Sequence, residues 1–159
     1  MKITVVCVGK IKEKFYSDAI AEYGKRLSRY CNLNIVEVAD EKTKEEASDT
    51  EIALVKAREG ERMKKAIKED GYVIALAIDG KQLDSVEMSE KIEKLGISGV
   101  SHIYFVIGGS LGLSDELLKM ADYRLSFSLM TFPHQLMRVI LLEQIYRSFR
   151  IINHEPYHK

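Results

Sequence analysis

Three uninterrupted apolar runs constrain the fold more than any other feature of the chain. They are ITVVCV at 3–8, YVIALAI at 72–78 and HIYFVI at 102–107. Runs of this length, rich in β-branched and aromatic residues, are typical of strands buried on both faces of a sheet. Two partly alternating segments, LNIVEV at 33–38 and YRLSFS at 123–128, predict two further strands. The chain therefore has the strands for one five-stranded sheet.

Helical periodicity fills most of the sequence between these strands. It predicts helices over 13–30, 51–69 and 85–95, a fourth that Ser114 caps, and a fifth from Pro133 to 149. Strands that alternate with helices favour an α/β fold, with a mostly parallel sheet and helices on both faces. A chain of 159 residues is long enough for one well-formed core and short for two. We therefore expect a single domain, 1–159.

Charge and cysteine content limit the possible partners. Twenty-four basic and twenty-four acidic residues cancel, so no net positive field attracts nucleic acid non-specifically, and an RNA partner would have to be recognised by local patches and shape. Cys7 and Cys31 lack CxxC spacing, and the apolar surroundings of Cys7 favour a buried thiol. No apolar stretch approaches the roughly twenty residues of a membrane span, and no cleavage signal is present. We expect a cytoplasmic protein with no membrane partner.

A glycine-rich loop follows the run at 102–107. Gly108, Gly109 and Gly112 leave the backbone there free of side chains, and ligands of open α/β sheets bind at such strand ends. The spacing matches neither the dinucleotide fingerprint GxGxxG nor the phosphate-binding GxxxxGK, so both readings lose support. The alternative is that these glycines only make a tight turn between a strand and a helix.

The segment FSLMTFPH at 127–134 is too apolar for an exposed connection. If it is an irregular loop that is buried or lines a pocket, its backbone amides and carbonyls need partners, and the edge of an adenine ring could supply them. The alternative is a core segment whose backbone groups are paired within the protein.

The last predicted helix is apolar in nearly every direction, so a single core face does not account for it. A second subunit packed against its outer side would explain the pattern, and we expect a homodimer through this C-terminal helix. A central helix within one subunit is the alternative, which is harder to arrange in a small chain. The apolar residues in question are Leu136, Met137, Val139, Ile140, Leu141, Leu142, Ile145, Tyr146 and Phe149.

Several motifs, taken together and in this order, resemble one known family. They are VGK at 8–10, IDGK at 78–81, IGGSLGLS at 107–114, SLMTFPHQLMRVILLEQIYR at 128–147 and the terminal PYHK. The whole chain is similar to the small bacterial SPOUT-class methyltransferases that act on a pseudouridine of large-subunit (23S) rRNA. One departure is Ser110-Leu111, where family members often carry Pro-Glu, and it changes the stiffness of the glycine loop.

The resemblance implies a C-terminal trefoil knot, a feature that no spacing argument would suggest because knots are rare. It also implies that the cofactor is S-adenosyl-L-methionine (SAM), bound in a bent shape within the knot. The implied cofactor contacts are Leu76, Gly108, Phe127, Ser128, Leu129, Met130, Thr131 and Phe132.

His134 and Arg138 are candidate catalytic residues. His134 follows the presumed cofactor loop, and its ordinary pKa suits proton transfer near neutrality. Arg138 lies one helical turn further on, where its guanidinium could hold a phosphate or a uracil carbonyl. The alternatives are that His134 only bonds backbone or phosphate, and that Arg138 forms an interface ion pair with Glu143 of a second copy.

The C-terminal tail carries Tyr157 and His158, which suit contact with a splayed-out RNA base. Tails are often only frayed ends, but the likeness of PYHK to the family favours a role in binding substrate RNA. His154 and His158 are four residues apart, yet Pro156 prevents the helix that would aim both at one ion. We expect no metal.

The reaction implied by the resemblance is methylation of N3 of a pseudouridine in 23S rRNA. The balanced charge of the chain favours the assembled ribosome as substrate, since shape-matched contacts must replace long-range attraction. Two other hypotheses stay open at this point: a non-catalytic module that associates with ribosomes, and a nucleotide-binding α/β enzyme.

Overall fold

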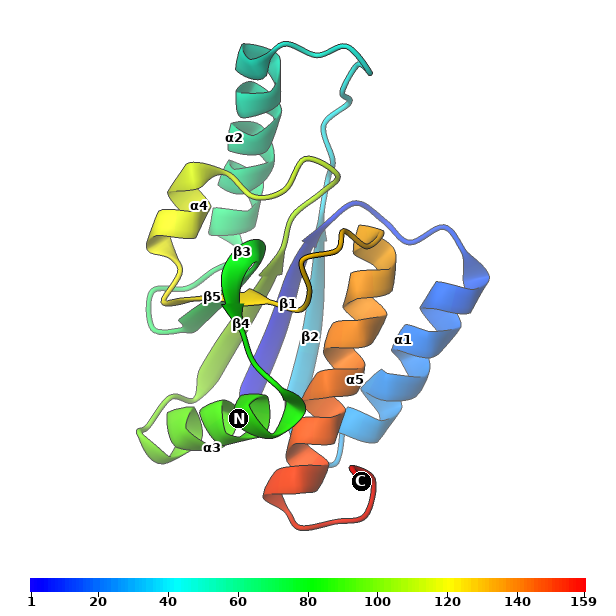
Figure 1. The fold of residues 1–159 in the computed structure, drawn as a ribbon, viewed down its shortest axis with the longest axis vertical. Coiled ribbons are helices and arrows are strands. Elements are labelled where there is room, and N and C mark those ends of the chain that lie inside the picture. Colours follow the sequence, from blue (N-terminus) through cyan, green and yellow to red (C-terminus); the bar gives the residue numbers. More distant parts are fainter.

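Five parallel strands form one sheet in this computed structural model, which describes residues 1–159 (Figure 1). The strands are β1 (Lys2–Val8), β2 (Asn32–Val38), β3 (Tyr72–Gln82), β4 (His102–Ile107) and β5 (Tyr123–Ser126). Their order across the sheet is β2-β1-β4-β3-β5, and every neighbouring pair runs parallel. The expected α/β class and parallel sheet are confirmed.

Helices cover both faces of this sheet. They are α1 (Lys14–Leu27), α2 (Asp49–Lys65), α3 (Ser85–Ile97), α4 (Asp115–Met120) and α5 (His134–Ile152). One hydrophobic cluster joins the sheet to α1, α3 and α5, and a second joins its other face to α2 and α4. Figure 1 shows α5 lying between α1 and α3. None of the helices combines the length and the apolar character that crossing a bilayer requires.

The two clusters follow from the alternation of side chains along buried strands. In β1, Ile3, Val5 and Cys7 belong to the cluster under α1, α3 and α5, whereas Val6 and Val8 belong to the other. Successive side chains of a strand point to opposite faces. A run that is apolar at every position is therefore what a central strand with helices on both sides needs.

Most helix ends lie within a few residues of their predicted positions. The Ser114 hydroxyl accepts a hydrogen bond from the N–H of Leu117 at 3.2 Å, so the predicted cap of α4 is confirmed. α2 ends at Lys65, four residues before its predicted end, and α5 continues to Ile152, three residues beyond its own. The tail is therefore shorter than expected.

The end of β3 crosses β5. The sequence predicts that this strand stops at 78, but Leu76 and Lys81 both pair with Leu125, and the residues between them form an irregularity in the ladder. Figure 1 shows the end of β3 passing in front of β5. This crossing brings β3, β5 and the segment that leads into α5 together. The trefoil knot itself stays an expectation carried by the resemblance.

Candidate active site

A pocket of about 160 Å³ lies at the carboxyl ends of β3, β4 and β5. Three segments form it: the end of β3 around Leu76, the glycine turn from Gly108 to Gly112, and the connection from β5 to α5 at 127–132. Ligands of open α/β sheets bind at this edge. The volume lies below the roughly 300–1,000 Å³ that is usual for small-molecule sites, so a cofactor-sized ligand would extend beyond the enclosed part.

The glycine turn forms one wall of the pocket. A Cβ atom on Gly108 would lie 2.6 Å from the carbonyl carbon of Gly112, so the two arms of the turn are too close for any side chain at 108. Gly112 has a φ of +86°, which L side chains rarely adopt, and its N–H donates to the Gly109 carbonyl at 3.0 Å. The glycines make a tight turn and also line the pocket.

The segment 127–132 forms the opposite wall, and its backbone is almost unpaired. None of its N–H or carbonyl groups takes part in a backbone–backbone hydrogen bond. The Met130 N–H donates to the Ser128 hydroxyl at 3.0 Å, and the Ser128 carbonyl accepts from Ser126. Backbone groups without partners beside a pocket are available to a ligand that carries donors and acceptors on its edge.

The structure brings seven of the eight predicted cofactor contacts to this pocket. They are Leu76, Gly108, Phe127, Ser128, Met130, Thr131 and Phe132. The eighth, Leu129, is not among the lining residues, and 78% of it is exposed. Sequence reasoning missed Ala77, Ile78 and Met137, which also line the pocket. The sequence signals were that Ala77 and Ile78 follow Leu76 directly, and that Met137 lies one helical turn after His134.

His134, the first residue of α5, lines this pocket and a second cavity beside it. Its Nδ1 atom is buried and has no hydrogen-bond partner. Burial, together with the positive charge of Arg138, lowers the pKa of the imidazole below its ordinary value, and Asp40 opposes this shift. A neutral imidazole at pH 7 can accept a proton, as a general base must.

Arg138 is held within the protein rather than presented to the pocket. Only 1% of it is exposed. Its guanidinium donates to the carbonyl oxygens of Val8 and Gly9 at 2.7 and 2.8 Å and pairs with Glu37 at 2.8 Å. The suggested partner Glu143 instead binds Arg147 of the same chain. These contacts favour a structural role, in which Arg138 fixes the loop after β1.

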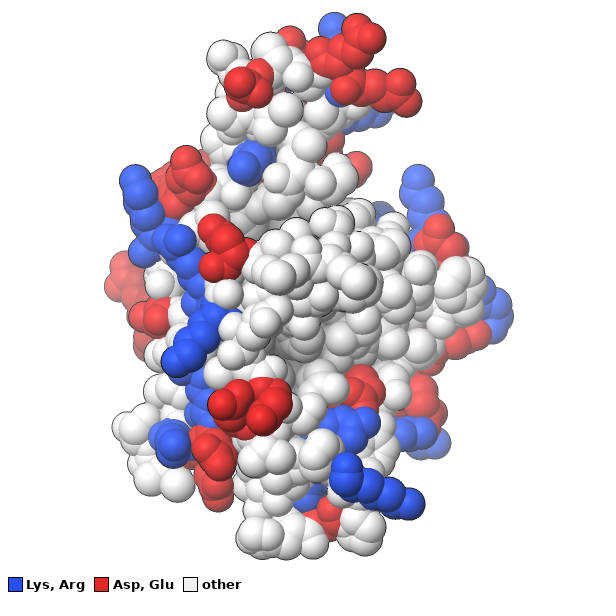
Figure 2. Space-filling model, in the orientation of Figure 1, with Lys and Arg blue, Asp and Glu red and all other residues white.

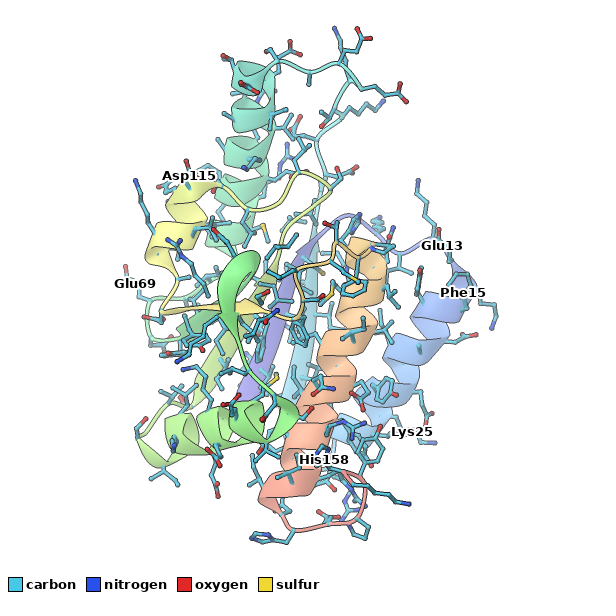
Figure 3. All side chains as sticks on the ribbon, viewed as in Figure 1. Glu13, Phe15, Lys25, Glu69, Asp115 and His158 are labelled. Carbon is cyan, nitrogen blue, oxygen red and sulfur yellow. The ribbon has the colours of Figure 1, made fainter.

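The tail is folded against α5 rather than loose. The Tyr157 hydroxyl donates to Glu143 at 2.9 Å, and Nδ1 of His158 lies 3.1 Å from the Arg147 guanidinium. Burial and the bond to Glu143 raise the pKa of the Tyr157 hydroxyl. Figure 3 shows His158 beside the C-terminal part of α5. Glu143 lies nine residues, or about 14 Å, along α5 from His134, and no tail residue lines the pocket of its own subunit.

The second cavity has a volume of about 600 Å³ and is more polar than the first. Gly109, Ser110 and His134 line both, so the two cavities share a wall. Glu59, a buried residue, also lines this cavity, and sequence reasoning missed it because it lies in a highly charged helix. Nowhere do three or more His, Cys, Asp or Glu side chains gather as metal ligands would.

Comparison with known proteins supports the likeness seen in the motifs. The family model described as "Predicted SPOUT methyltransferase" matches residues 1–158. The ribosomal RNA large subunit methyltransferase H of Bifidobacterium adolescentis is 65% identical, and that of Bifidobacterium animalis subsp. lactis is 59% identical, each over the full length of both chains. A methyltransferase structure from Legionella pneumophila, in complex with the cofactor SAM, aligns with a TM-score of 0.51 at 11% identity. That alignment covers 94% of this chain and 66% of the other. The chain belongs to the SPOUT methyltransferase family.

Proposed function

We propose that this protein transfers a methyl group from SAM to N3 of a pseudouridine in 23S rRNA, in the cytoplasm. The observation that carries the proposal is the pocket between Gly108 and the segment 127–132, whose walls are glycine backbone and unpaired amides. The full-length relatives, named as methyltransferases of the large ribosomal subunit, support the RNA substrate.

The pocket suits the adenine end of SAM. Unpaired N–H and carbonyl groups of 127–132 match the donors and acceptors on an adenine edge, and the apolar side chains of Leu76, Phe127 and Met137 suit the ring faces. SAM supplies a methyl group already activated on a positively charged sulfonium. SAM bound to the related Legionella pneumophila protein agrees with this assignment.

The protein then has to place the acceptor nitrogen in line with that methyl group and help the N3 proton to leave. Orientation within a closed site can supply several kcal/mol of the acceleration. His134 stands at the wall that both cavities share, and its lowered pKa keeps it able to accept the proton at neutral pH.

Two copies of the chain would complete the site. Figure 2 shows a hollowed area without Lys, Arg, Asp or Glu in the middle of this face, over the end of β3 and the start of α5. Near the end of β3 Ile78 is 48% exposed, and in the connection from β5 to α5 Leu129 and Met130 are 78% and 73% exposed. Apolar surface of this kind, beside a half-open pocket, suits a subunit interface. Pairing through α5 would also bring the Tyr157 tail of one copy toward the pocket of the other.

A transfer assay tests the proposal. Ribosomes from a strain that lacks the gene should accept labelled methyl groups from SAM, and mass spectrometry should locate the product on N3 of a pseudouridine. Intact ribosomes should be better substrates than naked rRNA. No transfer to any ribosomal particle would leave a non-catalytic ribosome-binding role, and tighter calorimetric binding of ATP, NAD or FMN than of SAM would favour a nucleotide-binding enzyme.

A further inference from the structure

Glu59 is a buried acid that the proposed chemistry does not yet use. It lies on α2 and is 5% exposed. Its Oε2 accepts the Glu41 N–H at 3.1 Å, whereas Oε1 makes no hydrogen bond and no salt bridge involves either oxygen. Burial raises the pKa of this carboxyl group, and the Glu41 N–H opposes the shift. Oε1 opens onto the polar cavity, and a ligand that covered it without supplying a donor would bind at a cost.

The free oxygen lies where the two cavities meet. A Cβ atom on Gly109 would be 3.2 Å from Oε1 and 3.4 Å from Oε2 of Glu59, so the carboxyl group lies against the glycine turn. Gly109 lines both the cofactor pocket and the polar cavity, and Glu59 lines the polar cavity. A flat ring in that cavity could present one edge to the cofactor pocket and another to Glu59.

Lysines at the same cavity fit a nucleotide. Lys10 and Lys12 line it, are exposed, and form no ion pair. They could contact the phosphates that flank a base turned out of its stack, since phosphate contacts position a nucleic acid without reading its sequence.

Pseudouridine and uridine differ by one donor when their reacting edges are superposed. In both bases N3 lies between two carbonyl groups, one of which is next to the ring atom that carries the ribose. The ring position on the far side of the other carbonyl group is N1–H in pseudouridine and C5–H in uridine. A site that selects pseudouridine therefore needs a hydrogen-bond acceptor at this position.

We propose that the methyl-accepting base lies in the polar cavity and that Glu59 accepts a hydrogen bond from its N1–H, which selects pseudouridine over uridine. This assignment rests on the proposed function. It makes Glu59 a specificity-determining residue, separate from the N3 proton acceptor.

The other carboxyl groups of the cavity are less suited to this task. Glu37 pairs with Arg138, and Glu41 pairs with Arg62 and Arg58. Asp40 is exposed, where water replaces a missing donor at little cost. Rejection of an analogue is strong only when the unmatched group of the protein is buried. Glu59 is the carboxyl group that is both buried and unpaired on one oxygen.

The test compares two ribosome preparations, one from a strain lacking this gene and one that also lacks the large-subunit pseudouridine synthases. Wild-type protein should methylate the first faster. Glu59→Ala should slow that reaction about 10- to 100-fold, as expected for a lost hydrogen bond to a charged group. It should not slow the reaction on uridine ribosomes and should not change the Kd for SAM. Glu59→Gln, of nearly equal volume, should lose part of the preference. Glu61→Gln, an exposed site on the same helix, is the matched control and should behave as wild type.

The outcomes separate this inference from the proposed function. Wild-type transfer to neither preparation would overturn the proposed function. Transfer without preference, or a preference that both Glu59 variants retain, would overturn only the assignment of Glu59. An equal loss of methylation rate on both preparations would also overturn the assignment of Glu59, because a structural or general-base role would slow both reactions alike. Thermal unfolding of each variant is measured first, and Glu59→Gln carries the test if Glu59→Ala does not fold.

Discussion

Arg138 Nη1 lies 2.8 Å from Glu37 Oε2, an ion pair that joins the first turns of α5 to the end of β2. The same guanidinium also holds the carbonyl groups of Val8 and Gly9. We predict that Arg138→Ala lowers the free energy of unfolding by about 2–4 kcal/mol, because it removes a buried, multiply bonded cation. Arg138→Lys should lose less, because the ammonium keeps the positive charge beside Glu37, although it cannot make the same planar set of bonds. Chemical denaturation measures both.

SAM binding by the same variants decides between the two roles considered for Arg138. If its role is structural, folded Arg138→Lys should lose stability and activity together. Wild-type stability and SAM affinity combined with a large loss of turnover would instead assign Arg138 to the chemistry.

Gly108→Ala should abolish tight SAM binding. The added Cβ would lie 2.6 Å from the Gly112 carbonyl carbon, so the turn must open and the wall of the pocket must move. We expect the Kd for SAM to rise at least about tenfold, since 1.4 kcal/mol of strain already gives that factor. Gly96→Ala is the control: it lies in α3, its Cβ would meet only the flexible end of Met1 at 3.5 Å, and SAM affinity should not change. Equal affinities in calorimetry would contradict the assignment of the pocket.

The sheet could be predicted because each strand carries its own signal in a short stretch of sequence. Apolar runs such as 102–107 are typical of strands buried between two layers. Three of them, together with two partly alternating strands and the helices between, left few alternatives. The last residues of β3 were missed because Asp79 and Gly80 are typical of a turn, and only pairing with distant Leu125 continues the strand. Long-range pairing of this kind leaves no local signal.

The residues of the candidate site also differ in whether the sequence reveals them. The glycine turn and 127–132 were found because a glycine-rich loop and an apolar connection are recognisable in a sequence. The burial of Arg138 and of Glu59 was not found, since charged residues on helices are ordinarily exposed and their partners lie 101 and 18 residues away. The folded tail was missed for a similar reason: Tyr157 bonds to Glu143 in α5 and Glu155 to Tyr30, which follows α1.

His134 should make the fold less stable in mild acid. Its pKa in the folded state is below its ordinary value, so the unfolded chain takes up a proton at a higher pH than the folded one does. Stability is therefore complete above the ordinary histidine pKa and is lost as pH falls from there through the lowered value. His102, whose pKa burial also lowers, adds to the effect. Denaturation at pH 7 and pH 5 should show a smaller difference in His134→Gln than in wild type, and an unchanged difference would contradict the buried, neutral imidazole.

The pH profile of methyl transfer follows from the same shift. If neutral His134 accepts the N3 proton, the rate should rise with pH through a value below that of an ordinary histidine and be level at neutrality. His134→Gln should slow transfer and remove this step. A profile that keeps its acid limb in His134→Gln would assign the step to another group.

The tail prediction tests whether two subunits share each site. Within one subunit Tyr157 packs on Tyr146 in the second half of α5, with ring centroids 4.9 Å apart, and neither residue lines the pocket. A chain lacking residues 157–159 should bind SAM normally and lose methyl transfer about tenfold or more, because stacking on a base contributes about 1–3 kcal/mol.

An equal mixture of this chain with Gly108→Ala, refolded together, contains heterodimers in which one intact pocket meets one intact tail. Half of the dimers in such a mixture are heterodimers, and each has one working site out of two. The mixture should therefore show about a quarter of wild-type activity. Tyr157→Phe keeps the ring but not the bond to Glu143, and it shows whether the ring or the hydroxyl acts. A mixture no more active than its separate components would show that each subunit works with its own residues alone.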